Sequence, residues 1–112
     1  MEFLGKLLIS TIAVLVTAYV LPGVHLDGVV TALVVAAVLS FLNAIVKPIL
    51  VILTIPITLF SLGLFLLVIN AVLILMADAL IKGFNVNGFW NALIFSLVLS
   101  FVNAVFSWLA KE

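Results

Sequence analysis

The heptapeptide VLSFLNA occupies residues 38–44, and VLSFVNA occupies residues 98–104, sixty positions later. The match extends outward, because GVHLDGVVTALVVAAVLSFLNAIV (23–46) aligns with GFNVNGFWNALIFSLVLSFVNAVF (83–106) with ten identities in twenty-four positions. A fixed offset of this kind is typical of the tandem duplication of one supersecondary unit. The stretches before each copy, 3–21 and 63–81, match only weakly, so this prediction rests on the second part of each unit.

The composition places the chain in a membrane. Of its 112 residues, 69% are hydrophobic and 7% are charged, which is too little charge to cover the surface of a water-soluble domain. A lipid bilayer is therefore the expected partner of most of the surface. The chain has no cysteine, which excludes disulfides and thiolate chemistry. Its net charge is zero and it has no basic run, so we expect no nucleic-acid partner.

The runs 7–24, 29–46, 48–77 and 83–110 carry no charge, and they predict four apolar stretches long enough to cross a bilayer, which requires about 20 residues. They lie near 3–21, 29–46, 63–81 and 91–110. The fold class expected is an all-α integral membrane protein, with four transmembrane helices that form two tandem helix-hairpin repeats offset by 60. We expect one transmembrane domain over 1–112, with repeat 1 at 3–46, a connector at 47–62 and repeat 2 at 63–110. Each repeat has two spans, so a pseudo-twofold axis along the membrane normal should relate the copies.

The linkers PGVHLDG (22–28) and KGFNVNG (82–88) contain the turn-forming residues of a chain that leaves the membrane. Apolar and polar residues alternate in both linkers. This alternation predicts two short extended segments at the membrane interface that pair across the pseudo-twofold axis. Tyr19, Phe89 and Trp90 are expected at the same interfacial level.

The connector KPILVILTIPITLFSL (47–62) is apolar but contains Pro48 and Pro56, each of which removes a helical N–H. We expect the second helix to kink or end near Pro48. A surface-lying or re-entrant piece would then start at Pro56, and Gly63 would allow the turn into the third span. A continuous kinked helix that runs to Thr54 also fits the sequence.

The lysines predict the orientation. With four spans, Lys6, Lys47 and Lys111 share one face of the membrane and Lys82 lies on the other. The positive-inside rule then places both termini in the cytoplasm. No small-x-small cleavage site follows the first apolar stretch, so we expect that stretch to be retained.

Small residues recur at every fourth position of the second and fourth predicted helices, and asparagines accompany them. Such strips let helices approach closely in lipid, and a buried amide needs a partner inside the protein. Packing within one protomer and a protomer interface or polar path are both consistent with the pattern. The candidates for helix packing or oligomerisation are Ala36, Ser40, Asn43, Ala44, Asn70, Ser96, Ser100, Asn103 and Ala104.

Asp78 is the only acidic residue within a predicted span, and it precedes Lys82 by four residues. This spacing favours an interfacial ion pair on a helix, whereas a proton or ion role is the alternative. His25 is the only histidine and is expected to be a solvated loop residue. We expect no metal site, no cofactor and no enzymatic activity, because no nucleophile elbow or phosphate-binding loop is present.

Three segments resemble one family of membrane proteins: LPGVHLDGVVTALVVA, LNAIVKPILVILTIPITLFSLGLFLLVINA and GFNVNGFWNALIFSLVLSFVNA. They are similar to the small four-span bacterial proteins of the phage holin family, superfamily IV. Asn43, Pro48, Pro56, Gly63 and Asn70 stand at that family's spacing, whereas Asn87 and Lys82 depart from its usual residues. The resemblance implies the bacterial cytoplasmic (inner) membrane, a homo-oligomer and no catalytic residue.

The resemblance also implies a function, which is that of a holin-like protein that self-associates and permeabilises the membrane when oligomerised. A non-enzymatic accessory or structural protein of the envelope, with a membrane-protein partner, is the alternative. A small proton-coupled transporter is a third hypothesis. The small four-span exporters use a glutamate in the middle of the first span, and this chain has none there.

Overall fold

The computed structural model describes residues 2–111, and Met1 and Glu112, the two ends of the expected domain, lie outside this range. Most of the described chain is helical, as the sequence predicts. The α-helices are α1 (Glu2–Val20), α2 (Val29–Phe41), α3 (Lys47–Leu53), α4 (Ile55–Phe60), α5 (Phe65–Leu80) and α6 (Gly88–Lys111). A π-helical turn, η1 (Leu42–Val46), joins α2 to α3, and two short strands are β1 (Val24–Leu26) and β2 (Phe84–Val86).

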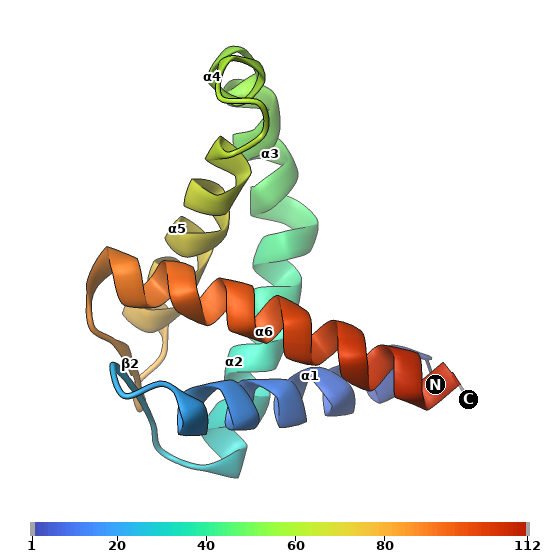
Figure 1. Cartoon of the computed structure of the whole chain (residues 1–112). Coiled ribbons are helices and arrows are strands. Elements are labelled where there is room, and N and C mark those ends of the chain that lie inside the picture. Colours follow the sequence, from blue (N-terminus) through green and yellow to red (C-terminus); the bar gives the residue numbers. More distant parts are fainter. Residues whose placement is uncertain (1, 112) are drawn as a thin grey trace.

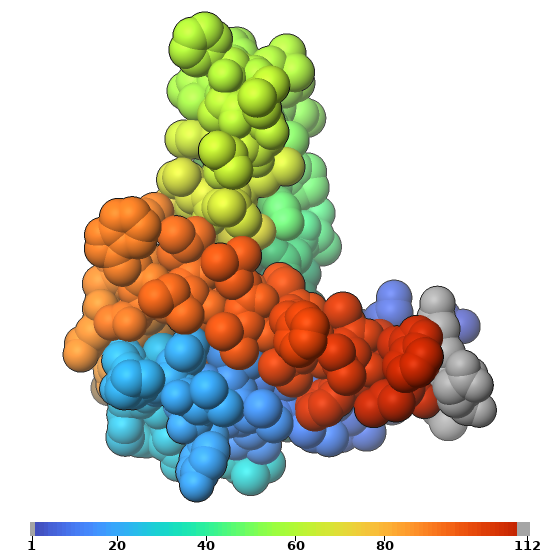
Figure 2. Space-filling model, viewed as in Figure 1, coloured from blue at the N-terminus to red at the C-terminus, as the bar shows by residue number. Residues whose placement is uncertain are grey.

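The helices form two arms that diverge from the corner where the strands lie (Figure 1). One arm consists of α1 and α6, which run antiparallel and pack against each other. The other arm contains α3, α4 and α5, and it continues the line of α2 away from the same corner. Figure 2 shows that the arms project separately from this corner. The start of α1 and the end of α6 lie together at the tip of the first arm.

Three helical stretches are long and apolar enough to cross a membrane by length and composition: Glu2–Val20, Val29–Leu53 and Gly88–Leu109. The fourth apolar helix, α5, has 16 residues. At 1.5 Å per residue it extends over about 24 Å, against about 30 Å for a bilayer core. The expected third span, 63–81, is therefore a shorter helix than the sequence indicated, because the turn from α4 ends only at Leu64.

The two strands pair antiparallel, as the alternation in the linkers predicts. The partners are Val24 with Val86, His25 with Asn85, and Leu26 with Phe84. Two further backbone hydrogen bonds flank the ladder, from the Asp27 N–H to the Gly83 carbonyl (2.8 Å) and from the Asn87 N–H to the Gly23 carbonyl (2.9 Å). The ladder thus joins the end of α1 to the end of α5 and fixes the corner from which both arms start.

The core is built where helices approach closely. Among the described residues it contains five alanines with no exposed surface, namely Ala13, Ala32, Ala71, Ala77 and Ala92. An alanine at a helix crossing lets two backbones come near, which gains van der Waals contact in lipid. At the corner, Phe84 and Phe95 are fully buried and their rings meet edge to face, with centroids 5.5 Å apart.

The second helix does not end at Pro48. The helical path runs from Val29 to Leu53, which corresponds to the continuous alternative left open by the sequence. The Lys47 N–H donates to the Leu42 carbonyl five residues earlier, so the π turn lies immediately before the proline. Pro48 itself occupies the first turn of α3, where a missing N–H costs little.

Beyond Thr54 the chain folds into the short helix α4, with Pro56 in its first turn. Gly63 then adopts a positive φ of 89° before α5 begins. This turn exposes large apolar side chains at the tip of the second arm, where Phe60 is 94% exposed. The tip carries no acidic or basic side chain.

Candidate functional site

Two small cavities lie on the inner faces of the helices, each with a volume of about 50 Å³. Leu39, Asn43 and Leu99 line both of them. The first cavity is completed by Asn70, Leu73, Ile74, Ser96 and Ser100. The second is completed by Ser10, Val14, Ala36, Ser40 and Asn103. A water molecule requires about 10–15 Å³ by this measure, so each cavity has room for a few.

The two cavities correspond to each other at the offset of sixty residues. Adding sixty to Ser10, Val14, Ala36 and Ser40 gives residues 70, 74, 96 and 100, which line the other cavity. The shared residues Leu39 and Leu99 are also sixty apart, and so are Asn43 and Asn103. The structure therefore brings Asn43, Asn70, Asn103 and the serines of both strips around these two related cavities. We call the two cavities and their lining residues the twin site.

The serines of the twin site satisfy part of their own hydrogen bonding. Ser40 Oγ donates to the Ala36 carbonyl and Ser96 Oγ donates to the Leu93 carbonyl, each at 2.8 Å and each within its own helix. The site does not depend on another chain to pair these two hydroxyls. Ser96 is also buried, whereas Ser40 is exposed.

The three amides differ from the serines. Within residues 2–111, no protein atom forms a hydrogen bond with the side chain of Asn43, Asn70 or Asn103. Asn43 is exposed, and Asn70 and Asn103 are partly buried. An amide without a partner in an apolar medium costs about 2–7 kcal/mol, so these groups require water or another protein surface.

The small-residue strips run from the interior to the surface. Ala36 and Ser96, the first members, are buried within the chain. The later members, Ser40 and Ala44 on one helix and Ser100 and Ala104 on the other, are exposed. Packing within the protomer therefore buries one end of each strip and leaves the other end exposed.

Asn43 stands in the π turn, where the backbone is also incompletely paired. The Lys47 N–H, which would normally donate to the Asn43 carbonyl, donates to Leu42. Pro48, the next residue along, has no N–H to offer. Asn43 thus combines an unpaired side-chain amide with a weakened backbone pairing. π turns occur frequently at functional sites.

The ion pair expected between Asp78 and Lys82 does not form. Instead, Asp78 Oδ2 accepts a hydrogen bond from the Val86 N–H at 3.0 Å. The helix ends at Leu80, and Ile81 is extended with φ −118° and ψ 125°, so Lys82 does not stand one helical turn after Asp78. Within the described range, the one close contact between a carboxylate and a basic side chain joins His25 Nε2 to Asp27 Oδ1 at 2.7 Å; both side chains are exposed, and the contact is an ion pair when the imidazole is protonated.

Residues 2–111 contain no group of three or more histidine, cysteine, aspartate or glutamate side chains that could hold a metal ion.

The sequence pattern does not select Ser10, although this residue lines the second cavity. Its position sixty residues before Asn70 is the signal that could have identified it.

An all-helical chain with several apolar spans and a polar twin site between them defines a multi-pass membrane protein. The match to known families is specific: residues 1–105 match the family of mycobacterial phage holins with four transmembrane segments, superfamily IV, and the chain belongs to that family. It is not a known enzyme family.

Two relatives are similar over most of their length. An uncharacterized membrane protein of Bacillus subtilis, YvlD, is 34% identical over 96 residues, which cover 85% of this chain and 81% of the relative. The uncharacterized protein SCO3922 of Streptomyces coelicolor is 38% identical over 112 residues, which cover 91% of this chain and 90% of the relative. No solved structure matches the chain.

Proposed function

We propose that the protein is a holin-like membrane protein that self-associates through the twin site and permeabilises the bilayer when oligomerised. The observation that carries this proposal is the set of three unpaired amides, Asn43, Asn70 and Asn103, beside exposed small residues. A second copy would supply both the amide partners and the close helix contact that these positions favour. The family to which the chain belongs is consistent with this activity.

The proposal includes the repeat architecture of one domain, with repeats at 3–46 and 63–110. The buried positions of α1 and α5 support it. Thr11, Ala13, Val14 and Thr17 are buried, and the residues sixty positions later, Ala71, Leu73, Ile74 and Ala77, are buried as well. The strand register supports it too, because exchanging the halves converts the pair Val24–Val86 into Leu26–Phe84. A pseudo-twofold axis along the membrane normal would relate the halves and pass through the ladder.

For the membrane, we propose the bacterial cytoplasmic membrane with both termini in the cytoplasm. Lys6, Lys47 and Lys111 then lie toward the cytoplasm, and the β1–β2 ladder lies on the opposite face. The connector would place α4 in the cytoplasmic interface, where Leu59, Phe60 and Leu62 expose apolar surface without any charge. Apolar helical surface of this kind lies in the headgroup region.

Self-association can be tested by cross-linking, because the chain has no native cysteine. Single Ala44→Cys and Ala104→Cys variants should form disulfide-linked dimers in native membranes. Trp90→Cys, at an exposed position at the start of α6 and away from the strips, is the matched control. Equal cross-linking of all three variants would indicate random collision and would contradict an interface at the strips.

Permeabilisation can be tested by dye entry and membrane potential during controlled overproduction. The natural sequence should depolarise cells abruptly, and an Asn43→Leu/Asn103→Leu variant at matched expression should not. Asn85→Leu, the same substitution at an exposed position of strand β2, should behave like the natural sequence. Cells that remain polarised at high expression of the natural sequence would exclude autonomous hole formation and favour the accessory envelope role, in which a membrane-protein partner copurifies.

The transporter hypothesis has less support in the structure. It requires Asp78 to release and bind protons, but the Asp78 carboxylate is held at the strand by the Val86 N–H. This contact favours a structural role for the only acidic residue within a predicted span.

A further inference from the structure

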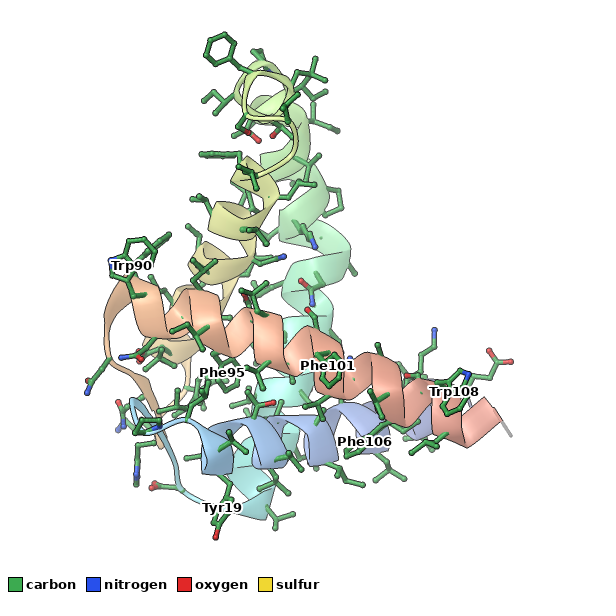
Figure 3. All side chains as sticks on the ribbon, in the orientation of Figure 1. Tyr19, Trp90, Phe95, Phe101, Phe106 and Trp108 are labelled. Atoms are coloured by element: carbon green, nitrogen blue, oxygen red, sulfur yellow. The ribbon has the colours of Figure 1, made fainter. Side chains whose placement is uncertain are left out.

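A larger cavity lies at the carboxyl end of α1, on the face of the molecule opposite the chain ends. Its volume is about 430 Å³, which is within the range of small-molecule sites. Leu15, Leu21, Val24 and Leu26 contribute apolar walls, and Tyr19 and His25 contribute polar groups. Tyr19 is 92% exposed and points away from the body of the molecule (Figure 3).

This hollow is a property of the first half of the chain. The residue sixty positions after Val24 is Phe84, which is fully buried against Phe95. The corresponding positions in the first half are Val24 and Val35, which are smaller. Phe84 packs against Phe95 on one side of the strand ladder, whereas the smaller Val24 lines the cavity on the other.

The carboxyl end of α1 has carbonyl groups without donors. The Leu21 N–H donates to the Thr17 carbonyl at 3.1 Å, and the next residue, Pro22, has no N–H to donate to Ala18. No basic residue stands in the last turn of α1 to balance the negative end of the helix dipole. Free carbonyls and a negative dipole end favour a cation, above all one with N–H groups that can donate.

A side chain that can donate to an anion, His25, lies beside these carbonyls. His25 Nε2 is engaged by Asp27 Oδ1 at 2.7 Å, which orients the ring. The other ring nitrogen, Nδ1, has no protein partner within the described part of the chain. When an imidazole is protonated, both of its nitrogens donate, and Nδ1 of His25 can then donate to a phosphate oxygen.

We propose that this cavity binds the headgroup of phosphatidylethanolamine in the membrane leaflet that faces away from the termini. The primary ammonium donates to the free carbonyls at the end of α1. The phosphate accepts from His25, and the acyl chains continue along the exposed apolar side chains Ile12 and Val16 of α1. A choline headgroup has no N–H and cannot make the carbonyl contacts, so the site discriminates between the two lipids. This proposal does not depend on hole formation.

Native mass spectrometry of the detergent-solubilised full chain tests the proposal. The protein is mixed with equal amounts of phosphatidylethanolamine and phosphatidylcholine that differ in acyl mass. We expect the ethanolamine lipid to be retained about tenfold more, as loss of a charge-assisted hydrogen bond predicts. His25→Leu and Val24→Phe should bring the ratio close to one. Asn85→Leu, which makes a comparable change at the corresponding position of the second half, should leave it unchanged.

Thermal unfolding in lipid-free detergent shows whether each variant is folded. If Val24→Phe fails to fold, the lipid ratio of His25→Leu still tests the proposal. The His25 side chain is 65% exposed, so its loss should not disturb packing. Equal retention of the two lipids, or an unchanged ratio in folded His25→Leu, would overturn the proposal. If phosphatidylglycerol were retained as well as phosphatidylethanolamine, the phosphate alone would be recognised. If soluble phosphoethanolamine at equal concentration displaced the lipid, the site would belong to a soluble ligand. Either result would overturn it.

Discussion

His25 lies directly opposite Asn85 in the β1–β2 ladder, and the two residues are also sixty positions apart in the sequence. The two backbone hydrogen bonds that flank the ladder repeat this relationship. The Asp27 N–H donates to the Gly83 carbonyl, and the Asn87 N–H, sixty positions later, donates to the Gly23 carbonyl. Each half of the chain thus presents the same backbone groups to the other. The ladder ties the halves together at their shared corner, and the stability of this corner can be tested residue by residue.

Gly83→Ala should destabilise the corner. Gly83 has a φ of 89°, which L side chains rarely adopt, and a Cβ there would lie 2.7 Å from Asp27 Oδ2. We expect a loss of about 1–3 kcal/mol in the free energy of unfolding in mixed micelles. Gly5→Ala is the matched control, because it has open space within α1 and should stabilise by about 0.5–1 kcal/mol. Equal effects at both glycines would contradict the ladder geometry.

Asp78→Ala should release β2 from α5. The substitution leaves the Val86 N–H without its acceptor, at a cost of about 1–3 kcal/mol. Asp78→Asn keeps a side-chain oxygen and should lose less. Hydrogen exchange at the Val86 amide is the direct measurement, with faster exchange in Asp78→Ala than in Asp78→Asn. Indistinguishable exchange rates in the two variants would show that the hydrogen bond contributes little.

Phe84→Ala should be the most damaging single truncation at the corner. The side chain is fully buried against Phe95, and such a loss typically costs about 3–5 kcal/mol. Phe101 on α6 is 70% exposed, so Phe101→Ala should change stability by no more than about 0.5 kcal/mol. Unfolding by detergent titration compares the two, and a similar loss from both would argue against this packing.

Pro48→Ala should remove the π turn. An alanine at this position supplies the missing N–H, so the helix can return to the four-residue hydrogen-bond pattern and turn α3 relative to α2. Spin labels on cysteines introduced at Val34 and Ile52, both exposed, report the change as a shifted interlabel distance. Pro56→Ala, which lies beyond the end of α3, should leave that distance unchanged. An unshifted distance in Pro48→Ala would mean that the proline does not cause the turn.

Much of this fold can be predicted from the sequence, because hydrophobic stretches and alternation report directly on lipid and on paired strands. The pairing of 24–26 with 84–86 is one such case. The continuation of the second helix beyond Pro48 is harder to predict from the sequence, because a proline is tolerated where a π turn has already displaced the neighbouring hydrogen bonds. The general rule that proline ends or kinks a helix does not take account of the π turn before Pro48.

The partner of Asp78 shows a second limit. The four-residue spacing predicts a pair with Lys82 only if the helix continues, and it stops at Leu80. The strand that supplies the Val86 N–H returns to the helix through a tertiary contact that local spacing does not encode. Similarly, the weak match between 3–21 and 63–81 concealed a common burial pattern, because a position can be buried by an alanine, a valine or a leucine alike.

The first arm combines a helix of each half, α1 with α6, and in the second arm α5 of the second half packs against α2 of the first half and against the connector helix α3. Within each half the two helices also pack on each other, α1 on α2 and α5 on α6, so a lone half would keep one helix pair but would lack its partner strand and the helix that completes its arm. If the halves arose by duplication, their common ancestor was an obligate pair of two-helix peptides, and gene fusion replaced a bimolecular encounter with a tether. The link around Leu62 and Gly63 would then serve mainly to raise the local concentration of each half. Polypeptides divided there and coexpressed would reassemble as a split protein.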